Sequence, residues 1–284
     1  MHTLIEQLGS GARVIAAELR PPRAELEAAA SRDAWIDTYH AVRTLTRDGT
    51  FVFLTDSAVG SKEEDNLRHL VINLGADVPR SSVVPFLTCK HSIDYSLSYA
   101  DRARDHGFKA LVVLGGDKRI GPARCVEHAW QLREQIRQRV PDLTLGGWAN
   151  PHADAAAQVN HLMQDRVHAE FYLTQIVSHH SRGAVERFLA EANRRGLALP
   201  GMFGIFYYRS ANARTLAALQ DFLPVPAEAL SREFGEGATA EEICARSIRA
   251  LMQAGVRHFY VSNLPLARAA VTLNRILSAV QFEV

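Results

Sequence analysis

The sequence contains little of what a secreted or membrane-spanning protein needs. Only three of its 284 residues are cysteines, and Cys89, Cys125 and Cys244 lie far apart, so neither a disulfide framework nor a Cys-x-x-Cys metal clip is expected. No apolar run approaches the roughly 18 residues that cross a bilayer, and Met1–Ser10 lacks the basic-then-apolar order of a signal peptide. We therefore expect a cytoplasmic protein that does not enter a membrane.

Net charge is equally scarce, because 32 Lys and Arg residues balance 31 Asp and Glu residues. The chain therefore has no global attraction for nucleic acid or for an anionic membrane, although a local basic pocket can still hold a phosphate. A composition of 47% hydrophobic and 22% charged residues is that of a globular protein and excludes disorder, a coiled coil and a collagen-like fibre. A small molecule is the expected partner, and the sequence leaves open whether the chain forms a homo-oligomer.

Common catalytic motifs are missing as well. There is no Gly-x-x-x-x-Gly-Lys-[Ser/Thr] loop, and Leu8-Gly9-Ser10-Gly11 precedes a predicted strand instead of following one, so it is not a dinucleotide motif. The twelve histidines include no His-x-His and no helical i, i+4 pair, and the adjacent His179 and His180 point in different directions on a helix or a strand. We therefore expect no metal site and interpret the histidines as solvated loop residues.

What the sequence does contain is an alternation of short apolar, β-branched segments with amphipathic stretches. Eight such units predict an α/β protein with a single domain, residues 1–284, folded as a (β/α)8 TIM barrel. The predicted strands are Arg13–Leu19, Phe51–Leu54, Val83–Leu87, Ala110–Leu114, Leu143–Ala149, Phe171–Ile176, Met202–Phe206 and His258–Val261.

Helices are predicted between these strands from apolar residues at helical spacing. Examples are Ala34–Arg47, Lys62–Leu74, Ala123–Arg139, Ala184–Arg195 and Leu266–Val280. Residues 224–254 interrupt the pattern. Prolines and glycines between Pro224 and Gly237 indicate an insertion, followed by a further helix at Ala240–Ala254 before the eighth strand.

The active site of a TIM barrel lies at the carboxyl ends of its strands, so the residues that end or follow each strand are the candidates. Glu18 ends an apolar run, and burial there raises the pKa of a carboxyl group and prepares a general acid, unless Glu18 pairs with Arg20 or Arg23. Asp117 follows two glycines, which fits close approach to a flat ring or a phosphate, or an ordinary turn. Gln175 can recognise an amide or pyrimidinone edge, or be a satisfied buried amide.

The order of short motifs along the chain resembles the methylenetetrahydrofolate reductase family, collinearly from about Val14 to Leu277. Its Glu-Phe-x-Pro-Pro is similar to Glu18-Leu19-Arg20-Pro21-Pro22, and its Thr-x-Gly-x-x-Gly-x-x-x-Asp loop is similar to residues 55–65. Further similar segments are Phe86-Leu87-Thr88-Cys89, Leu114-Gly115-Gly116-Asp117, Trp148-Ala149-Asn150-Pro151-His152, Leu173-Thr174-Gln175, Pro200-Gly201-Met202, and His258-Phe259-Tyr260 with Asn263.

The resemblance implies a flavoprotein oxidoreductase of one-carbon metabolism that uses NADH or NADPH and FAD to reduce 5,10-methylenetetrahydrofolate to 5-methyltetrahydrofolate, or that runs the reverse reaction. It implies that the catalytic Glu18 protonates the bridged imidazolidine ring, which opens to an iminium, and that the catalytic Asp117 holds the pterin and tunes the flavin. Substrate-binding residues on the same basis are Gln175, Tyr208 and Thr88. The implied cofactor-binding residues are Thr55, Ala58, Gly116, Asp117, Trp148, His152 and Arg166.

Departures from the family pattern fall mainly on the flavin side, while the acid, the aspartate and the glutamine are retained. We therefore expect FAD to be held differently, through Trp148, His152 and Arg166. The altered positions are Phe86 in place of a histidine, Gly115 and Leu264 in place of arginines, and, approximately, Arg166 and Ala169-Glu170-Phe171 in place of a lysine and an Ala-Gly-Ala stretch.

Three alternatives stay open. The same reaction can pass hydride directly from the nicotinamide to the folate without a flavin. A barrel of another class binds reduced pterins without redox chemistry, as a carrier or a methyl-transfer partner, and such a protein needs no acid at Glu18. The third alternative is a flavin-dependent barrel enzyme that acts on a different substrate. Competition by tetrahydrofolate analogues would distinguish it from a folate enzyme.

Overall fold

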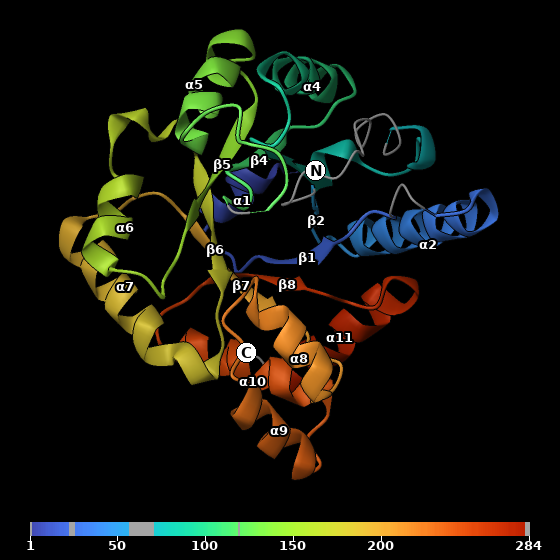
Figure 1. Ribbon diagram of the computed structural model, residues 1–284, viewed down its shortest axis with the longest axis vertical. Coiled ribbons are helices and arrows are strands. Elements are labelled where there is room, and N and C mark those ends of the chain that lie inside the picture. Colours follow the sequence, from blue (N-terminus) through green and yellow to red (C-terminus); the bar gives the residue numbers. More distant parts are fainter. Residues whose placement is uncertain (1, 23–25, 57–70, 119, 282–284) are drawn as a thin grey trace.

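Eight parallel strands close into a barrel in the computed structural model, which describes residues 2–22, 26–56, 71–118 and 120–281. Each strand pairs with the next along the chain, and β8 returns to pair with β1 (Figure 1). The predicted TIM barrel is confirmed. The strands are β1 (Ile15–Leu19), β2 (Val52–Leu54), β3 (Val83–Thr88), β4 (Ala110–Leu114), β5 (Thr144–Ala149), β6 (Phe171–Ile176), β7 (Gly201–Phe206) and β8 (His258–Ser262).

Helices surround the barrel and connect its strands. The described ones are α1 (Leu4–Gly9), α2 (Ala28–Arg47), α4 (Ile93–Asp105), α5 (Ala129–Arg139), α6 (Ala155–Leu162), α7 (Arg182–Arg195), α8 (Ala213–Gln220), α9 (Ala227–Gly235), α10 (Ala240–Gln253) and α11 (Ala269–Val280), with short 3₁₀ turns η1 (Arg80–Ser82), η2 (Asp165–Val167), η3 (His179–Ser181) and η4 (Leu266–Arg268). The helix predicted at Lys62–Leu74 falls mostly outside the described residues.

Helix α5 begins at Ala129, six residues later than the sequence pattern suggested. The preceding residues form a loop that packs back onto the barrel, because the ammonium group of Lys90 donates to the carbonyl oxygens of Ile120 and Pro122, each 2.7 Å away. Lys90 is only 7% exposed, so these two hydrogen bonds are sheltered from water. The loop after β4 is therefore fixed to the end of β3.

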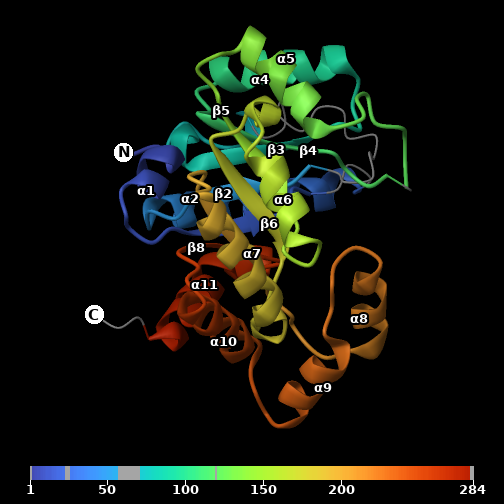
Figure 2. The same cartoon turned by 90° about the vertical axis from the view of Figure 1, so that its left-hand side faces the viewer.

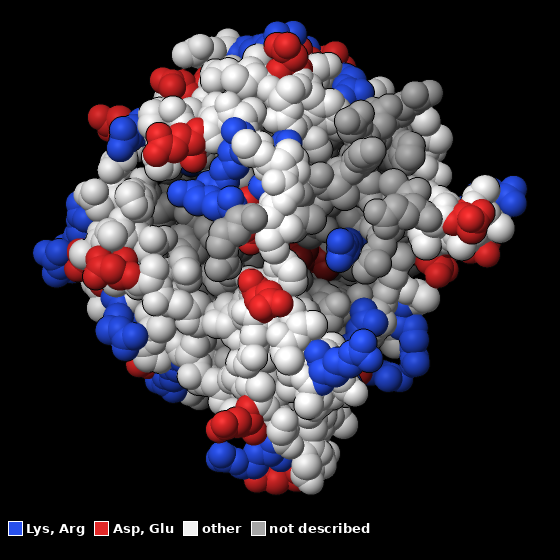
Figure 3. Space-filling model, viewed as in Figure 1, with Lys and Arg blue, Asp and Glu red and all other residues white. Residues whose placement is uncertain are grey.

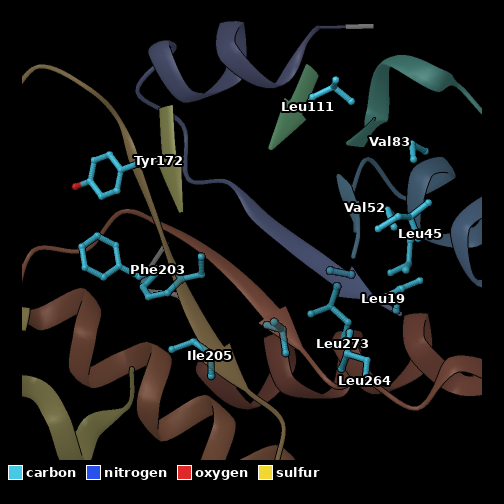
Figure 4. Packing of buried hydrophobic residues seen from close by; sticks show 14 of the residues in the cluster. Leu19, Leu45, Val52, Val83, Leu111, Tyr172, Phe203, Ile205, Leu264 and Leu273 are labelled. Atoms are coloured by element: carbon cyan, nitrogen blue, oxygen red, sulfur yellow. The ribbon is translucent and has the colours of Figure 1, made fainter. Parts of the chain in front are cut away.

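The apolar side chains form two concentric layers, as the two-residue alternation of a strand requires. One cluster fills the barrel itself, with Ala16, Phe53, Val112 and Tyr260 among its members. A larger cluster lies between the outer face of the barrel and the helices, where Val52, Val83 and Leu111 of the strands share a core with Leu45 of α2 and Leu273 of α11 (Figure 4). A residue's position in the alternation therefore decides which layer it joins.

Helix α1 closes the amino-terminal end of the barrel. Its Leu4 and Leu8 join the interior cluster, and a capping box between Thr3 and Glu6 starts the helix. The opposite end carries the loops that follow the strands, and Figure 2 shows α1 on one side of the molecule with α8 and α9 on the other. The candidate site therefore lies at the end that Figures 1 and 3 present to the viewer.

The insertion has different limits from those the sequence predicted. Helix α10 contacts α7, α11 and β7, so it occupies the regular place of a helix between two barrel strands and is not an extra element. The additional pieces are α8 and α9, which pack on each other over a small core formed by Tyr208, Leu216, Leu230 and Ile243. The inserted helices therefore run from Ala213 to Gly235, so they begin and end earlier than the predicted residues 224–254, whereas the helix predicted at Ala240–Ala254 is present as α10.

Candidate active site

Five polar or aromatic side chains lie toward the carboxyl ends of strands, at the open end of the barrel. Four of them follow the alternation of the interior cluster, in which every second residue of a strand points inward, whereas a register shift in β6 interrupts that alternation at Gln175, and Ile176 joins the interior cluster. Figure 3 shows this face hollowed near its middle, with acidic atoms recessed in the hollow and basic side chains near its edge. The five residues are Glu18 of β1, Thr88 of β3, Trp148 of β5, Gln175 of β6 and Ser262 of β8.

Glu18 stands in an apolar setting between the buried residues Ala17 and Leu19. Its carboxyl oxygen Oε1 accepts a hydrogen bond from Oγ of Ser262 on the neighbouring strand at 2.7 Å. Burial raises the pKa of Glu18 to about 7, and the Ser262 hydrogen bond works against that rise. Within the described residues Glu18 forms no ion pair, so Arg20 does not neutralise it, and Arg23 lies outside them. The carboxyl group can therefore hold its proton close to neutral pH.

A second carboxylate, Asp56, follows β2, and although it is one of the residues that follow a predicted strand, the sequence predicted no role for it. Its Oδ2 accepts hydrogen bonds from the backbone N–H of Thr88 at 2.7 Å and from the Thr88 hydroxyl at 2.8 Å, and lies 2.9 Å from Nε2 of His91. The side chains of His91 and Asp56 are 9% and 5% exposed, so His91 is not the solvated loop histidine that the sequence suggested. The sequence contained one indication of this pair: Asp56 and His91 follow the adjacent strands β2 and β3, so they were expected at the same end of the barrel.

Thr88 was predicted to contact the substrate, but it contacts Asp56 instead. It is 2% exposed, and both its donors are directed at Asp56. Thr88 therefore positions Asp56 at the barrel end and does not itself reach the open space. Thr55, in the same β2 loop, is half-buried and its N–H donates to the carbonyl of Leu19 at 3.1 Å, whereas Ala58 lies outside the described residues.

Asp117 and the two glycines before it form the turn after β4. Oδ1 of Asp117 accepts from the N–H of Ile120 at 3.2 Å, and Gly116 has a φ of 74°, a conformation that favours glycine. The guanidinium of Arg124 lies over this turn and donates to the Gly116 carbonyl. A Cβ at position 115 would lie 2.7 Å from the Arg124 guanidinium carbon, so a side chain there would require the Arg124 guanidinium to move aside.

Gln175 and Tyr208 lie where β6 and β7 end, beneath the inserted helices. Oε1 of Gln175 accepts from the N–H of Ile176 at 2.9 Å, and its Nε2 lies 3.5 Å from the carbonyl of Phe222 in the insertion. Tyr208 is 6% exposed, and burial raises the pKa of its phenol well above the ordinary value. Tyr208 lines a cavity of about 240 Å³ together with His152, whose Nε2 lies 2.8 Å from the Ile176 carbonyl.

Trp148 and Arg166, the remaining predicted cofactor residues, are exposed. Trp148 is 38% exposed although it belongs to a strand, which is expected of an inward-facing side chain at the barrel's open end. The guanidinium carbon of Arg166 lies 4.7 Å from the ring centre of Trp130 on α5, and its Nε donates to Gln164 at 2.7 Å. The structure therefore holds Arg166 on the surface beside α5.

His179 and His180 correct a further sequence expectation. Their ring centres are 3.8 Å apart, and both Nε2 atoms lie 3.1 Å from the carboxylate of Glu233 on α9. On a regular helix or strand the two adjacent side chains would diverge. The two residues instead occupy η3, a tight turn that directs both rings toward the insertion.

Comparison with known proteins establishes the fold and no more. No protein-family model and no curated protein matches the sequence. Rhizobium etli pyruvate carboxylase superposes with a TM-score of 0.58 at 12% identity, over 98% of this chain and 25% of that one. Its carboxyl transferase domain superposes with a TM-score of 0.56 at 11% identity, over 96% and 44% of the two chains. A Pseudomonas aeruginosa protein provisionally assigned as a dihydrodipicolinate synthetase gives 0.50 at 10% identity, over 94% and 74%.

The chain thus spans about a quarter of the length of the pyruvate carboxylase that it matches. Likeness at these identities shows a TIM barrel, a fold that supports many unrelated chemistries. None of the described helices is both long enough and apolar enough to cross a bilayer. Any assignment of activity has to rest on the site itself.

Proposed function

We propose that this barrel is a methylenetetrahydrofolate reductase that interconverts 5,10-methylenetetrahydrofolate and 5-methyltetrahydrofolate with NADH or NADPH, through FAD. The observation that carries the proposal is Glu18, a carboxyl group at the open end of the barrel whose pKa is raised by burial to about 7. An acid with a pKa near the working pH is suited to donate a proton and regain it in each cycle. The collinear motifs that resemble the reductase family name the substrate for that acid.

In the proposed mechanism, protonated Glu18 donates its proton to a nitrogen of the five-membered imidazolidine ring, and the ring opens. Ser262 donates a hydrogen bond to the same carboxyl group, so it fixes the orientation of Glu18 and stabilises the carboxylate left after proton transfer. Reduced FAD, when bound, supplies the hydride that reaches the opened one-carbon unit. Gln175, at the end of β6, is the proposed partner of a pterin edge, which its amide would meet by exchanging its contacts with the Ile176 N–H and the Phe222 carbonyl.

The structure also supports a way of holding the cofactor despite the altered positions. Where the family carries an arginine, this chain has Gly115, and the guanidinium of Arg124 fills the space where that side chain would begin. Nε of Arg124 is buried and has no hydrogen-bond partner among the described residues, which is costly unless an acceptor pairs with it. The cation that the family supplies at position 115 is thus supplied here by Arg124, from a later position in the chain, and its guanidinium beside the Gly115–Gly116 turn would pair with an acceptor of a flavin ring or phosphate after a shift that exposes it.

Substitution of the acid tests the mechanism against a protein that only binds pterins. Glu18→Gln should leave tetrahydrofolate affinity nearly unchanged and lower kcat by about 10²–10⁴-fold, because a positioned general acid typically contributes that much. The surface variant Glu186→Gln, in which an ion pair of α7 with Arg182 is lost, serves as the matched control and should keep wild-type turnover. Steady-state kinetics and binding titrations measure both quantities. Unchanged turnover in Glu18→Gln would exclude the proposed acid, and lost binding with lost turnover would point to a structural role.

A further inference from the structure

The first turn after β6 and the inserted helix α9 meet at a compact group of three metal-ligating side chains. His179 and His180 belong to η3, and Glu233 belongs to α9. Nε2 of His179 is 3.1 Å from Oε1 of Glu233, and Nε2 of His180 is 3.1 Å from Oε2. The potential ligand atoms of all three lie within 4.8 Å of one another. Two separate segments of the chain thus direct nitrogen and oxygen donors at one point.

The surroundings of His179 determine which of its nitrogens faces that point. Oγ of Ser247 donates to the carbonyl of Ile243, one turn earlier in α10, at 3.2 Å. Oγ of Ser247 also lies 2.8 Å from Nδ1 of His179, so it can accept a hydrogen bond from that nitrogen. Without an ion, the 3.1 Å contact between Nε2 and Oε1 of Glu233 is a hydrogen bond in which Nε2 carries the hydrogen. With an ion bound, Nδ1 would carry the hydrogen and donate to Ser247, which leaves the lone pair of Nε2 for the metal. A hydrogen bond of this kind to the outer nitrogen is typical of histidines that bind metals.

We propose that His179, His180 and Glu233 form a binding site for a divalent transition-metal ion, with Zn²⁺ as the best fit, which fastens the inserted helices to the barrel. Two imidazoles and one carboxylate are a common zinc ligand set, and tetrahedral bonds of about 2.0–2.2 Å place ligand atoms roughly 3.4 Å apart. The observed N–O separations of 3.1 Å are close to that spacing, so small side-chain movements complete the site. The proposal does not depend on the reductase activity.

One of the three ligands, His180, borders open space. His180 lines the cavity of about 240 Å³ that also contacts Tyr208 and Pro226, so an ion held here would be accessible to water or to a small ligand. The side chains of His179, His180 and Glu233 are 20%, 24% and 12% exposed, which leaves a route for the ion to enter. One competing cation is present, because Arg246 donates to Oε1 of Glu233 at 2.9 Å.

Metal titration of the whole purified chain, stripped with a chelator, tests the proposal. We expect one equivalent of Zn²⁺ in competition with a chromophoric chelator, and visible d–d absorption when Co²⁺ replaces it. Zn²⁺ should also raise the melting temperature, because it binds the folded state only. His180→Ala and Glu233→Gln should each weaken binding by more than about 100-fold, which exceeds the 10–100-fold typical for loss of an outer-shell partner. Ser247→Ala should give a loss within that smaller range.

Two further variants separate a metal site from a simple imidazole–carboxylate pair. His161→Ala, which removes an exposed histidine of α6, is the matched control and should bind Zn²⁺ like the wild type. Arg246→Ala should bind Zn²⁺ at least as tightly as the wild type, because the competing cation is gone. Far-UV circular dichroism checks that each variant is folded. If Glu233→Gln does not fold, the Zn²⁺ affinity of His180→Ala decides the test. Zn²⁺ binding that is absent, or equal in wild type and His180→Ala, would overturn the proposal.

Discussion

A carboxyl group that keeps its proton near neutral pH does so at the expense of folding stability. Glu18 is the clearest case in this protein, because burial raises its pKa to about 7 from the ordinary 4.5 and no cation among the described residues offsets that effect. Its single described hydrogen-bond donor is the Ser262 hydroxyl. Such a residue is more often kept for chemistry than for stability, since a neutral amide of the same shape would avoid the unfavourable charge.

The stability of Glu18→Gln should therefore depend on pH in a defined way. Between pH 4.5 and about 7 the folded state binds a proton that the unfolded state has lost, so wild-type stability falls as the pH rises through this window. The glutamine variant avoids the loss and should be about 2–3 kcal/mol more stable than the wild type at pH 8, with little difference at pH 4.5. Urea unfolding at a series of pH values measures the difference. A difference that does not change with pH would show that Glu18 is not buried as described.

Single residues were predictable from the sequence only where local context decides their environment. Glu18 lies in an apolar run, so its burial followed from its neighbours. The pairing of Asp56 with His91 joins residues 35 positions apart, and nothing local to either residue indicates the other. The convergence of His179 and His180 was not predicted, because adjacent side chains diverge on a regular helix or strand and these two lie in a 3₁₀ turn.

Among the elements, β7 and β8 show how closely the barrel interior is packed. Gly204 of β7 faces the ring of Tyr260 on β8, and a Cβ at position 204 would overlap that ring. Tyr260 is 1% exposed and its hydroxyl donates to the carbonyl of Thr174 on β6, so the ring has no room to move aside. The absence of a side chain at Gly204 is what allows a tyrosine to cross the barrel beneath the site.

Gly204→Ala should consequently destabilise the barrel by about 1–3 kcal/mol, the usual cost of overpacking a filled core. Gly235→Ala is the matched control, because a Cβ at the end of α9 meets nothing within 4 Å. Urea denaturation followed by fluorescence compares the two variants with the wild type. Equal stability of Gly204→Ala and the wild type would mean that Tyr260 can be displaced without cost.

Strands were easier to predict than the elements between them. Each predicted strand overlaps an observed one, because the apolar β-branched segments are short, buried and separated by turn residues. The helix boundaries and the limits of the insertion were harder to predict. Lys90 holds the loop that precedes α5, and α10 is placed by its contacts with α7 and α11. Both are tertiary contacts that a helical pattern does not encode.

At the scale of the whole molecule, the inserted helices change the shape of the open end. Loop residues of the insertion reach the barrel interior, where Leu223 packs against the inner cluster and the Phe222 carbonyl lies beside Gln175. The cavity beneath them and the candidate zinc ligands are on the β6–β7 side, whereas Glu18 and Ser262 are on the β1–β8 side. A ligand that contacts both Glu18 and Gln175 has to lie across the open end of the barrel, as an extended folate with its ring system would.

Anaerobic oxidation of NADH by the purified protein, dependent on 5,10-methylenetetrahydrofolate and measured with and without added FAD, tests the central proposal most directly. We expect folate-dependent turnover that requires FAD, together with the visible absorption of a bound flavin. The rate should also fall tenfold per pH unit above about pH 7, because Glu18 loses its proton there. Equal turnover without any flavin would replace the flavin route by direct hydride transfer. No turnover with NADH or NADPH in either case would contradict the proposed reductase.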